Sequence, residues 1–141
     1  MISLPLIILF QFYFWNLNFN NYVKSYLFAS KGFECEYEEE LKNLIIPLPE
    51  RTVFKGKQDG CSPFYITYVN VTDFESFYQK ELKSLKNQGK IQSYRDIERT
   101  DKDWTEDQGF VVELPSGSTI EIFTYTIKGS GIIAIDYQRS H

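Results

Sequence analysis

The chain has 141 residues, with 15 Lys or Arg against 19 Asp or Glu, so its formal net charge is −4. This length fits one domain with a real core, and the acidic balance excludes a nucleic-acid partner, since no basic face replaces counterions along the phosphates. The only histidine is His141, and Cys35 and Cys61 form no C-x-x-C pair. The ligand sets of zinc, haem and redox sites are therefore missing, and we expect no metal and no cofactor.

Residues 1–31 form a hydrophobic N-terminal segment. Its first 15 residues, MISLPLIILFQFYFW, are too few to cross a bilayer but long enough for the core of an export signal. No basic residue precedes them, and the lysines that follow, Lys24 and Lys31, would hold the remainder in the cytoplasm by the positive-inside rule. Three interpretations stay open: an export signal, a membrane anchor, or a helix packed on the domain. We favour export or anchoring, hence membrane association, because water tolerates little exposed apolar surface.

Residues 32–141 are expected to form a single domain. In Gly32–Leu44 the spacing of Phe33, Tyr37, Leu41 and Leu44 predicts a short amphipathic helix with an acidic outer side. Two prolines then keep residues 45–49 extended.

Two strands are predicted next, at Thr52–Lys57 and Phe64–Val71. Cys61 lies between them, 26 positions after Cys35. Outside the cytoplasm the two cysteines could close a disulfide worth about 3 kcal/mol by loop entropy. The alternative is two buried thiols.

A helix is predicted from Thr72 to Gln88. Thr72 and Glu75 fit a capping box, and Gly89 supplies the stop. One helical stripe collects the large apolar side chains, which are Phe74, Phe77, Tyr78, Leu82 and Leu85. Glu81 falls inside this apolar arc, where its carboxylate either reaches solvent or a hydroxyl group, or faces a ligand in a lined pocket.

Residues 90–108 are polar, with Ile91, Tyr94 and Ile97 able to form a strand or a sheet edge. Within them, Asp101–Asp107 opens like a calcium loop but lacks its glycine and its bidentate glutamate, so we expect no calcium. Trp104 in this acidic loop is interpreted as a lid over the core edge or, less simply, as a ligand platform.

Three apolar runs separated by turn residues predict an antiparallel meander over Gly109–Tyr137. In the second run both parities are apolar, which indicates a bulge near Ile122 or a strand covered on both faces. If the helix covers one face, the other needs residues 1–44, loops or a partner.

Catalytic patterns are absent from the sequence, because no base accompanies a nucleophile and no glycine-rich loop opens a helix. We therefore expect a protein that is not an enzyme. The segments PLPERT (47–52), FESFYQKEL (74–82) and the whole stretch 109–137 resemble small uncharacterised extracytoplasmic domains of bacterial lipoproteins or secreted proteins. The resemblance covers about residues 45–137 and implies export but no activity. No lipobox precedes Cys35.

The predicted fold is α+β: an antiparallel sheet of four or five strands in the order β-β-α-(β)-β-β-β, with the C-terminal meander and one main helix on one face, loosely similar to the cystatins. The leading functional hypothesis is a non-enzymatic envelope or secreted module that binds another protein, or a second copy, through its sheet. The alternative is a small-ligand binder with a pocket between helix and sheet, lined by Glu81, Tyr65 or Tyr68, and Trp104. A cytoplasmic location is the second choice after the cell envelope.

Overall fold

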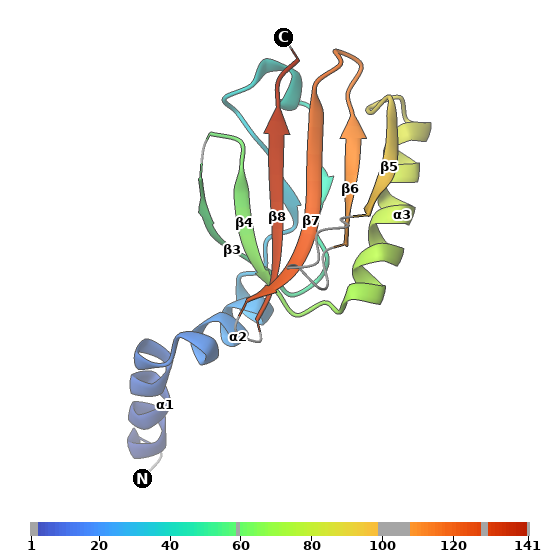
Figure 1. Ribbon diagram of the computed structural model, residues 1–141. Helices are drawn as coiled ribbons and strands as arrows, with labels where there is room; N and C mark the ends of the chain where they lie inside the picture. Colours follow the sequence, from blue (N-terminus) through green and yellow to red (C-terminus); the bar gives the residue numbers. More distant parts are fainter. Residues whose placement is uncertain (1–2, 59, 99–107, 128–129, 141) are drawn as a thin grey trace.

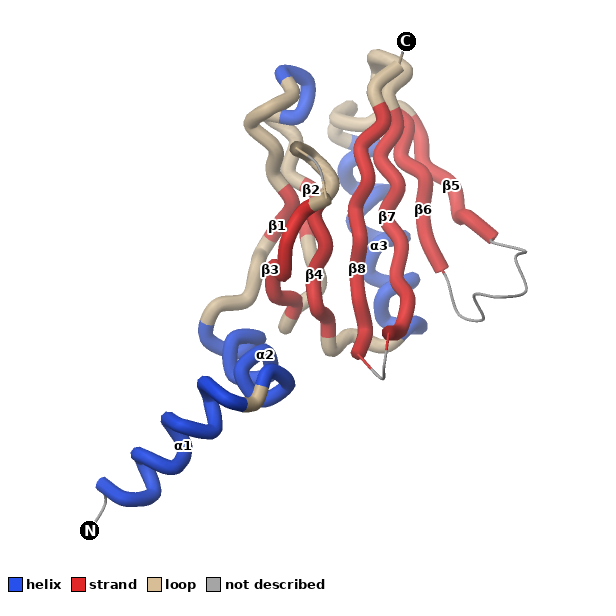
Figure 2. Tube along the Cα trace, turned by 60° about the vertical axis from the view of Figure 1, so that its left-hand side comes forward, coloured by secondary structure: helices blue, strands red, loops and turns tan. Residues whose placement is uncertain are grey.

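A computed structural model describes residues 3–58, 60–98, 108–127 and 130–140. Its main element is a six-stranded sheet with the strand order β3-β4-β8-β7-β6-β5, in which each neighbouring pair is antiparallel. Figures 1 and 2 show helix α3 on one side of this sheet and two N-terminal helices leading away from one end. The predicted α+β class is therefore confirmed.

The predicted order of strands and main helix is also observed. The strands are β3 Thr52–Lys57, β4 Pro63–Thr67, β5 Ser93–Glu98, β6 Gln108–Glu113, β7 Thr119–Ile127 and β8 Ser130–Gln138. Six strands form where four or five were predicted, because the weakly patterned β5 pairs with β6 along its whole length. Its position at the sheet edge explains its polar sequence, since an edge strand tolerates charged side chains.

The C-terminal meander consists of β6, β7 and β8, as predicted. The register between β7 and β8 runs without interruption, so the bulge considered near Ile122 is not formed. Ile120 and Ile122 are fully buried, whereas Phe123 and Tyr125 alternate onto the opposite face and are half-buried. β7 is therefore apolar on both faces, while the described bulge lies in β3, between Phe54 and Gly56.

Helix α3, Val71–Asn87, buries the predicted apolar stripe against the inner face of the sheet. The rings of Phe74 and Tyr78 lie 6.1 and 6.2 Å from the ring of Phe110 on β6. Leu82 is also fully buried, and Leu85 nearly so. One face of this helix therefore supplies much of the core.

The two ends of α3 are capped differently from each other. At its start the side chain of Asn70 accepts a hydrogen bond from the amide of Asp73 at 2.8 Å, so the predicted Thr72 capping box is wrong. Asparagine is among the best N-cap residues. Asn70 caps the helix two positions before the predicted Thr72, and β4 ends at Thr67 rather than at the predicted Val71. At its end Gly89 has a φ of 74°, and the amides of Gly89 and Lys90 bond to carbonyls of the last turn.

The predicted amphipathic helix in residues 32–44 is wrong. The segment holds a two-residue strand, β1 Gly32–Phe33, and a 3-10 turn, η1 Glu39–Leu41; β1 pairs with β2 Ile46–Pro47. Phe33 and Cys35 are buried at alternate positions of an extended chain, and Tyr37 is 74 % exposed. Pairing with β2 and the Cys35–Cys61 disulfide require this extended path, which no helix provides.

The N-terminal segment forms two helices, α1 Ser3–Trp15 and α2 Leu17–Leu27. The chain is extended at Asn16 between them, and the side chain of Asn16 caps α2 by accepting from the amide of Phe19 at 3.0 Å. α2 packs against β3 and buries Asn21 and Ser25, whereas α1 extends away from the domain (Figure 1). Among the described residues, no helix combines the length and apolar character needed to cross a membrane.

Candidate functional site

The sheet has an inner face that packs against α3 and an outer face that carries a row of half-buried side chains. Helix α3 and the apolar residues of 33–48 belong to one core with the inner face. On the outer face, Ile66 of β4 and Tyr125 of β7 both lie opposite Ile132 of β8, and the Phe123 and Tyr125 rings stack at 5.8 Å. These four side chains are half-buried. We call this row the outer strip.

The structure places three of the four residues predicted to line a ligand pocket. Tyr65 is buried on the inner face, where burial raises its pKa to about 12. Tyr68 lies beyond the end of β4 and lines a different cavity. Glu81 is half-buried on α3, and Trp104 lies outside the described residues.

A small cavity of about 110 Å³ lies between α3 and the sheet. It is lined by Glu75 of α3, not Glu81, together with Asp96, Gln108 and Phe110. Among the described residues, the side-chain oxygen of Gln108 is buried there without a hydrogen-bond partner. The cavity is smaller than the usual range for drug-sized ligands, about 300 to 1,000 Å³.

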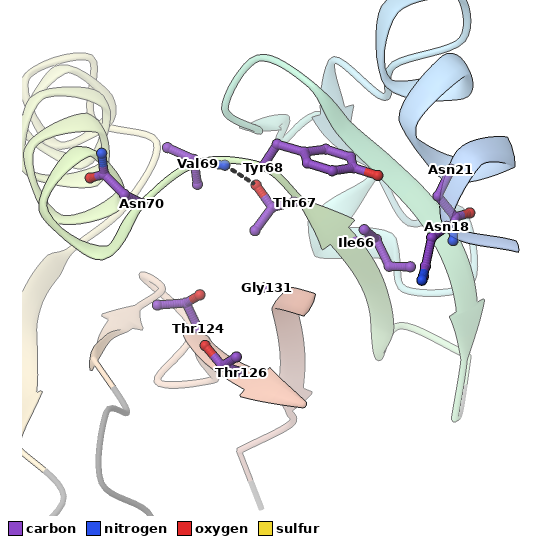
Figure 3. A pocket seen from close by; sticks show the side chains of 10 residues that line it. All are labelled: Asn18, Asn21, Ile66, Thr67, Tyr68, Val69, Asn70, Thr124, Thr126 and Gly131. Carbon is purple, nitrogen blue, oxygen red and sulfur yellow. Dashed lines mark hydrogen bonds between the residues drawn. The ribbon is translucent and has the colours of Figure 1, made fainter. Parts of the chain in front are cut away.

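A larger cavity, of about 420 Å³, opens between α2 and the lower end of the sheet (Figure 3). Asn18 and Asn21 of α2 line one side, Thr124 and Thr126 of β7 the other, and Thr67 and Tyr68 lie above them. We call it the amide pocket. The remaining four lining residues are Ile66, Val69, Asn70 and Gly131.

Several polar groups of the amide pocket are already engaged within the protein. The hydroxyl of Thr67 pairs with that of Thr52 at 3.0 Å, and the hydroxyl of Thr124 donates to the carbonyl of Ile132 at 2.9 Å. The side-chain oxygen of Asn21 accepts from Lys55 at 3.5 Å. These bonds hold the pocket walls in place.

An aromatic cage beside the pocket fixes α2 to the domain. The guanidinium carbon of Arg51 lies 4.9, 4.1 and 4.8 Å from the ring centroids of Tyr22, Tyr26 and Tyr68. Two of its nitrogens also lie 3.4 Å from the hydroxyl oxygen of Ser25. Arg51 has a φ of 59°, a conformation that costs a non-glycine residue free energy and that the cage contacts offset.

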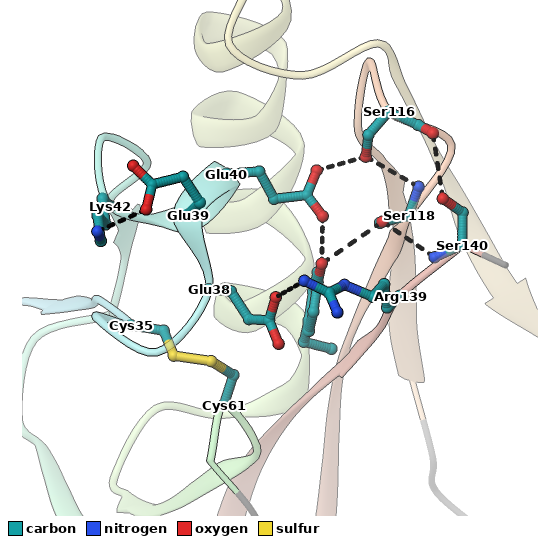
Figure 4. A network of polar contacts seen from close by, with 11 residues as sticks. Cys35, Glu38, Glu39, Glu40, Lys42, Cys61, Ser116, Ser118, Arg139 and Ser140 are labelled. Atoms are coloured by element: carbon teal, nitrogen blue, oxygen red, sulfur yellow. Dashed lines mark hydrogen bonds and ion pairs between the residues drawn. A yellow bond between two sulfur atoms is a disulfide. The ribbon is translucent and has the colours of Figure 1, made fainter.

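A polar network joins residues 38–40 to the end of the sheet that lies away from the amide pocket (Figure 4). Ser116 and Tyr137 donate to the Glu40 carboxylate, and Arg139 pairs with Glu38 at 3.1 Å. Burial raises the pKa of Glu40, but the hydroxyl donors Ser116, Tyr137 and Ser118 and the charge of Arg139 together lower it below its usual value. Conversely, burial and the Glu40 carboxylate raise the pKa of Tyr137.

This network joins the loop that carries Glu38 and Glu40 to the sheet. The sequence predicted these glutamates as the acidic outer side of a helix, and no local pattern predicted Ser116, Tyr137 or Arg139 as their partners. Cys35 and Cys61 form a disulfide next to it, with 5.7 Å between their Cα atoms (Figure 4). Within the described ranges, no three acidic, cysteine or histidine side chains gather as a metal site.

Comparison with protein-family models, curated proteins and solved structures found no match.

Proposed function

We propose that the chain is a non-enzymatic module of the cell envelope that is held at a lipid surface by α1. The observation that carries this proposal is the exposure of α1, none of whose residues is buried. Nine large apolar side chains of this helix are exposed to solvent: Leu4, Leu6, Ile7, Ile8, Leu9, Phe10, Phe12, Phe14 and Trp15. They surround the helix on all sides, as in a helix immersed in an apolar medium.

The free energy of burying these side chains, and the length of α1, support lipid as that apolar medium. If lipid removes the remaining exposed half of each side chain from water, the gain is about 1 kcal/mol per residue, or on the order of 10 kcal/mol in total. A single myristoyl chain, at about 10⁴ M⁻¹, gives only marginal membrane binding. At 1.5 Å per residue, the 13 residues of α1 measure about 20 Å and reach well into a hydrocarbon core of about 30 Å.

The contacts of α2 support the retention of the N-terminal residues 1–31 on the mature protein. A cleaved export signal contributes nothing to the mature fold, but α2 supplies the buried residues Asn21 and Ser25 and two of the tyrosines around Arg51. The Cys35–Cys61 disulfide supports an oxidising compartment, since such bonds are rare in the cytosol. The proposal is therefore an anchor that stays on the protein.

Vesicle flotation of the full chain tests the anchor. We expect the wild type to float with phosphatidylcholine vesicles, and Ile8→Asp with Phe12→Asp to abolish most of the flotation, because each charge is costly in hydrocarbon. The matched control is Ser76→Asp with Gln79→Asp, which adds the same charges to exposed positions of α3 and should float normally. A wild type that stays with the soluble fraction, or whose mature mass lacks α1, overturns the proposal.

The partner surface predicted on the sheet stays a prediction. The outer strip is compatible with it, because Ile66 and Ile132 pair across β4 and β8 and their apolar side chains are half-buried. Another protein and a second copy of the chain are both compatible with such a row.

A further inference from the structure

We infer that the amide pocket binds a neutral, hydroxyl-rich ligand of about the size of a hexose unit. This inference goes beyond the proposed membrane anchoring and does not depend on it. Its volume, about 420 Å³, lies within the range of small-ligand sites, about 300 to 1,000 Å³.

The charge of the lining argues for a neutral ligand. None of the ten lining residues is charged. The nearby guanidinium of Arg51 is already held among three tyrosine rings and the hydroxyl of Ser25. At the pocket edge the ammonium of Lys55 already donates to the side-chain oxygen of Asn21, so a cation would lose its hydration beside a like charge, and an anion would find no charged group among the lining residues.

The lining chemistry argues for hydroxyl groups on the ligand. Within the described part of the chain, the amide of Asn18 and the hydroxyl of Thr126 make no hydrogen bond, and the amide nitrogen of Asn21 donates none. Amides and hydroxyls both donate and accept, as sugar hydroxyls do, so each can pair with a neighbouring ligand hydroxyl. Ile66 and Val69 add apolar surface for the C–H groups of such a ligand.

Two sources share this chemistry: a free saccharide and the headgroup of a neutral glycolipid. The pocket lies beside α2, at the end of the domain from which α1 extends (Figures 1 and 3). A headgroup would therefore be within reach if α1 enters lipid. The experiment below separates the two sources.

The test uses the full chain, in phosphatidylcholine nanodiscs if α1 inserts into lipid and otherwise in buffer without detergent, because sugar-based detergents would compete. Calorimetric titration with glucose, galactose, mannose and N-acetylglucosamine should give saturable binding for at least one of them, with glucuronate and glucose 6-phosphate clearly weaker. In the second arm, nanodiscs containing galactosylceramide are probed for competition with the bound sugar; competition assigns the headgroup as a source, and its absence leaves the free saccharide. No saturable binding to any neutral sugar, or equal binding of the charged sugars, overturns the inference.

Substitutions locate the binding in the pocket. Thr126→Val keeps the side-chain shape on an exposed strand position but removes its hydroxyl, and Asn18→Ala removes an exposed amide. Each should weaken sugar binding about three- to tenfold, the usual effect of one neutral hydrogen bond. The matched controls, Thr119→Val on the same strand and Asn87→Ala on α3, lie outside the pocket and should bind as the wild type does. If the controls and the pocket variants behave alike, the binding site lies elsewhere and the inference is wrong.

Discussion

The hydroxyl group of Tyr78 lies in the core without a hydrogen-bond partner among the described residues. Burial, together with the nearby Tyr65 and Glu81, raises the pKa of Tyr78 well above its usual value. Removing a hydroxyl from water without a new hydrogen bond destabilises the folded state by about 1 to 3 kcal/mol. The ring, by contrast, packs between Phe74 and Phe110.

Replacing Tyr78 by Phe should therefore leave stability unchanged or raise it by up to about 1 kcal/mol, because only the unpaired hydroxyl is lost. Urea unfolding followed by near-ultraviolet circular dichroism measures the difference. The matched control is Tyr137→Phe, which removes a hydroxyl that donates to Glu40 and should cost about 1 to 2 kcal/mol. A loss of more than about 1 kcal/mol in Tyr78→Phe would show that its hydroxyl is bonded.

At the residue scale, the sequence predicts burial better than it predicts partners. The stripe of α3 follows from spacing alone, so the burial of Phe74 could be foreseen. Both parities of β7 are apolar, so the spacing did not predict that Ile120 and Ile122 form its buried set. The bond between Glu40 and Tyr137 joins positions 97 apart, and no local pattern encodes it. The same holds for Arg51, whose three tyrosines come from two separate segments.

At the element scale, Arg51 is the residue that fastens α2 to the sheet. Replacing it by Gly should loosen α2, because the guanidinium contacts with Tyr22, Tyr26 and Tyr68 disappear while glycine still accepts the positive φ. Loss of about 1.4 kcal/mol of cation–π attraction corresponds to about tenfold faster amide exchange in α2. Hydrogen exchange resolved by segment measures this change.

The control for that experiment is Arg139→Ala, whose partner Glu38 lies at the other end of the sheet. Exchange in α2 should stay at the wild-type rate in this variant, and exchange in α3 should stay unchanged in both. Equal protection of α2 in Arg51→Gly and wild type would mean that other contacts dock this helix.

Among the elements, the long periodic ones were predictable and the short ones were not. Helix α3 and the meander carry many residues that agree on one period. In residues 32–44, by contrast, four apolar side chains match a helical face by chance, while the pairing of β1 with β2 and the disulfide decide the conformation. The N-cap is Asn70 and not the predicted Thr72, because both residue types cap well and only the tertiary structure decides between them.

At the scale of the whole molecule, the amide pocket could not be predicted. Its walls come from α2, from the end of β4 and from β7, three segments that are far apart in the sequence. Of the two tyrosines predicted as alternatives, Tyr65 lies in the core and Tyr68 lies beyond the end of β4. The proposed anchor, in contrast, rests on a pattern that is visible in the sequence, the apolar run of residues 1–15.

The anchor is tested most directly by the fluorescence of Trp15, which is 88 % exposed at the end of α1. The chain has two tryptophans, so Trp104→Phe leaves Trp15 as the only one. On addition of phosphatidylcholine vesicles we expect its emission to shift to the blue, and vesicles of brominated phosphatidylcholine should quench it, because α1 carries the ring into the interface. Emission that stays at the wavelength of a water-exposed indole, unquenched by the brominated lipid, would contradict the account.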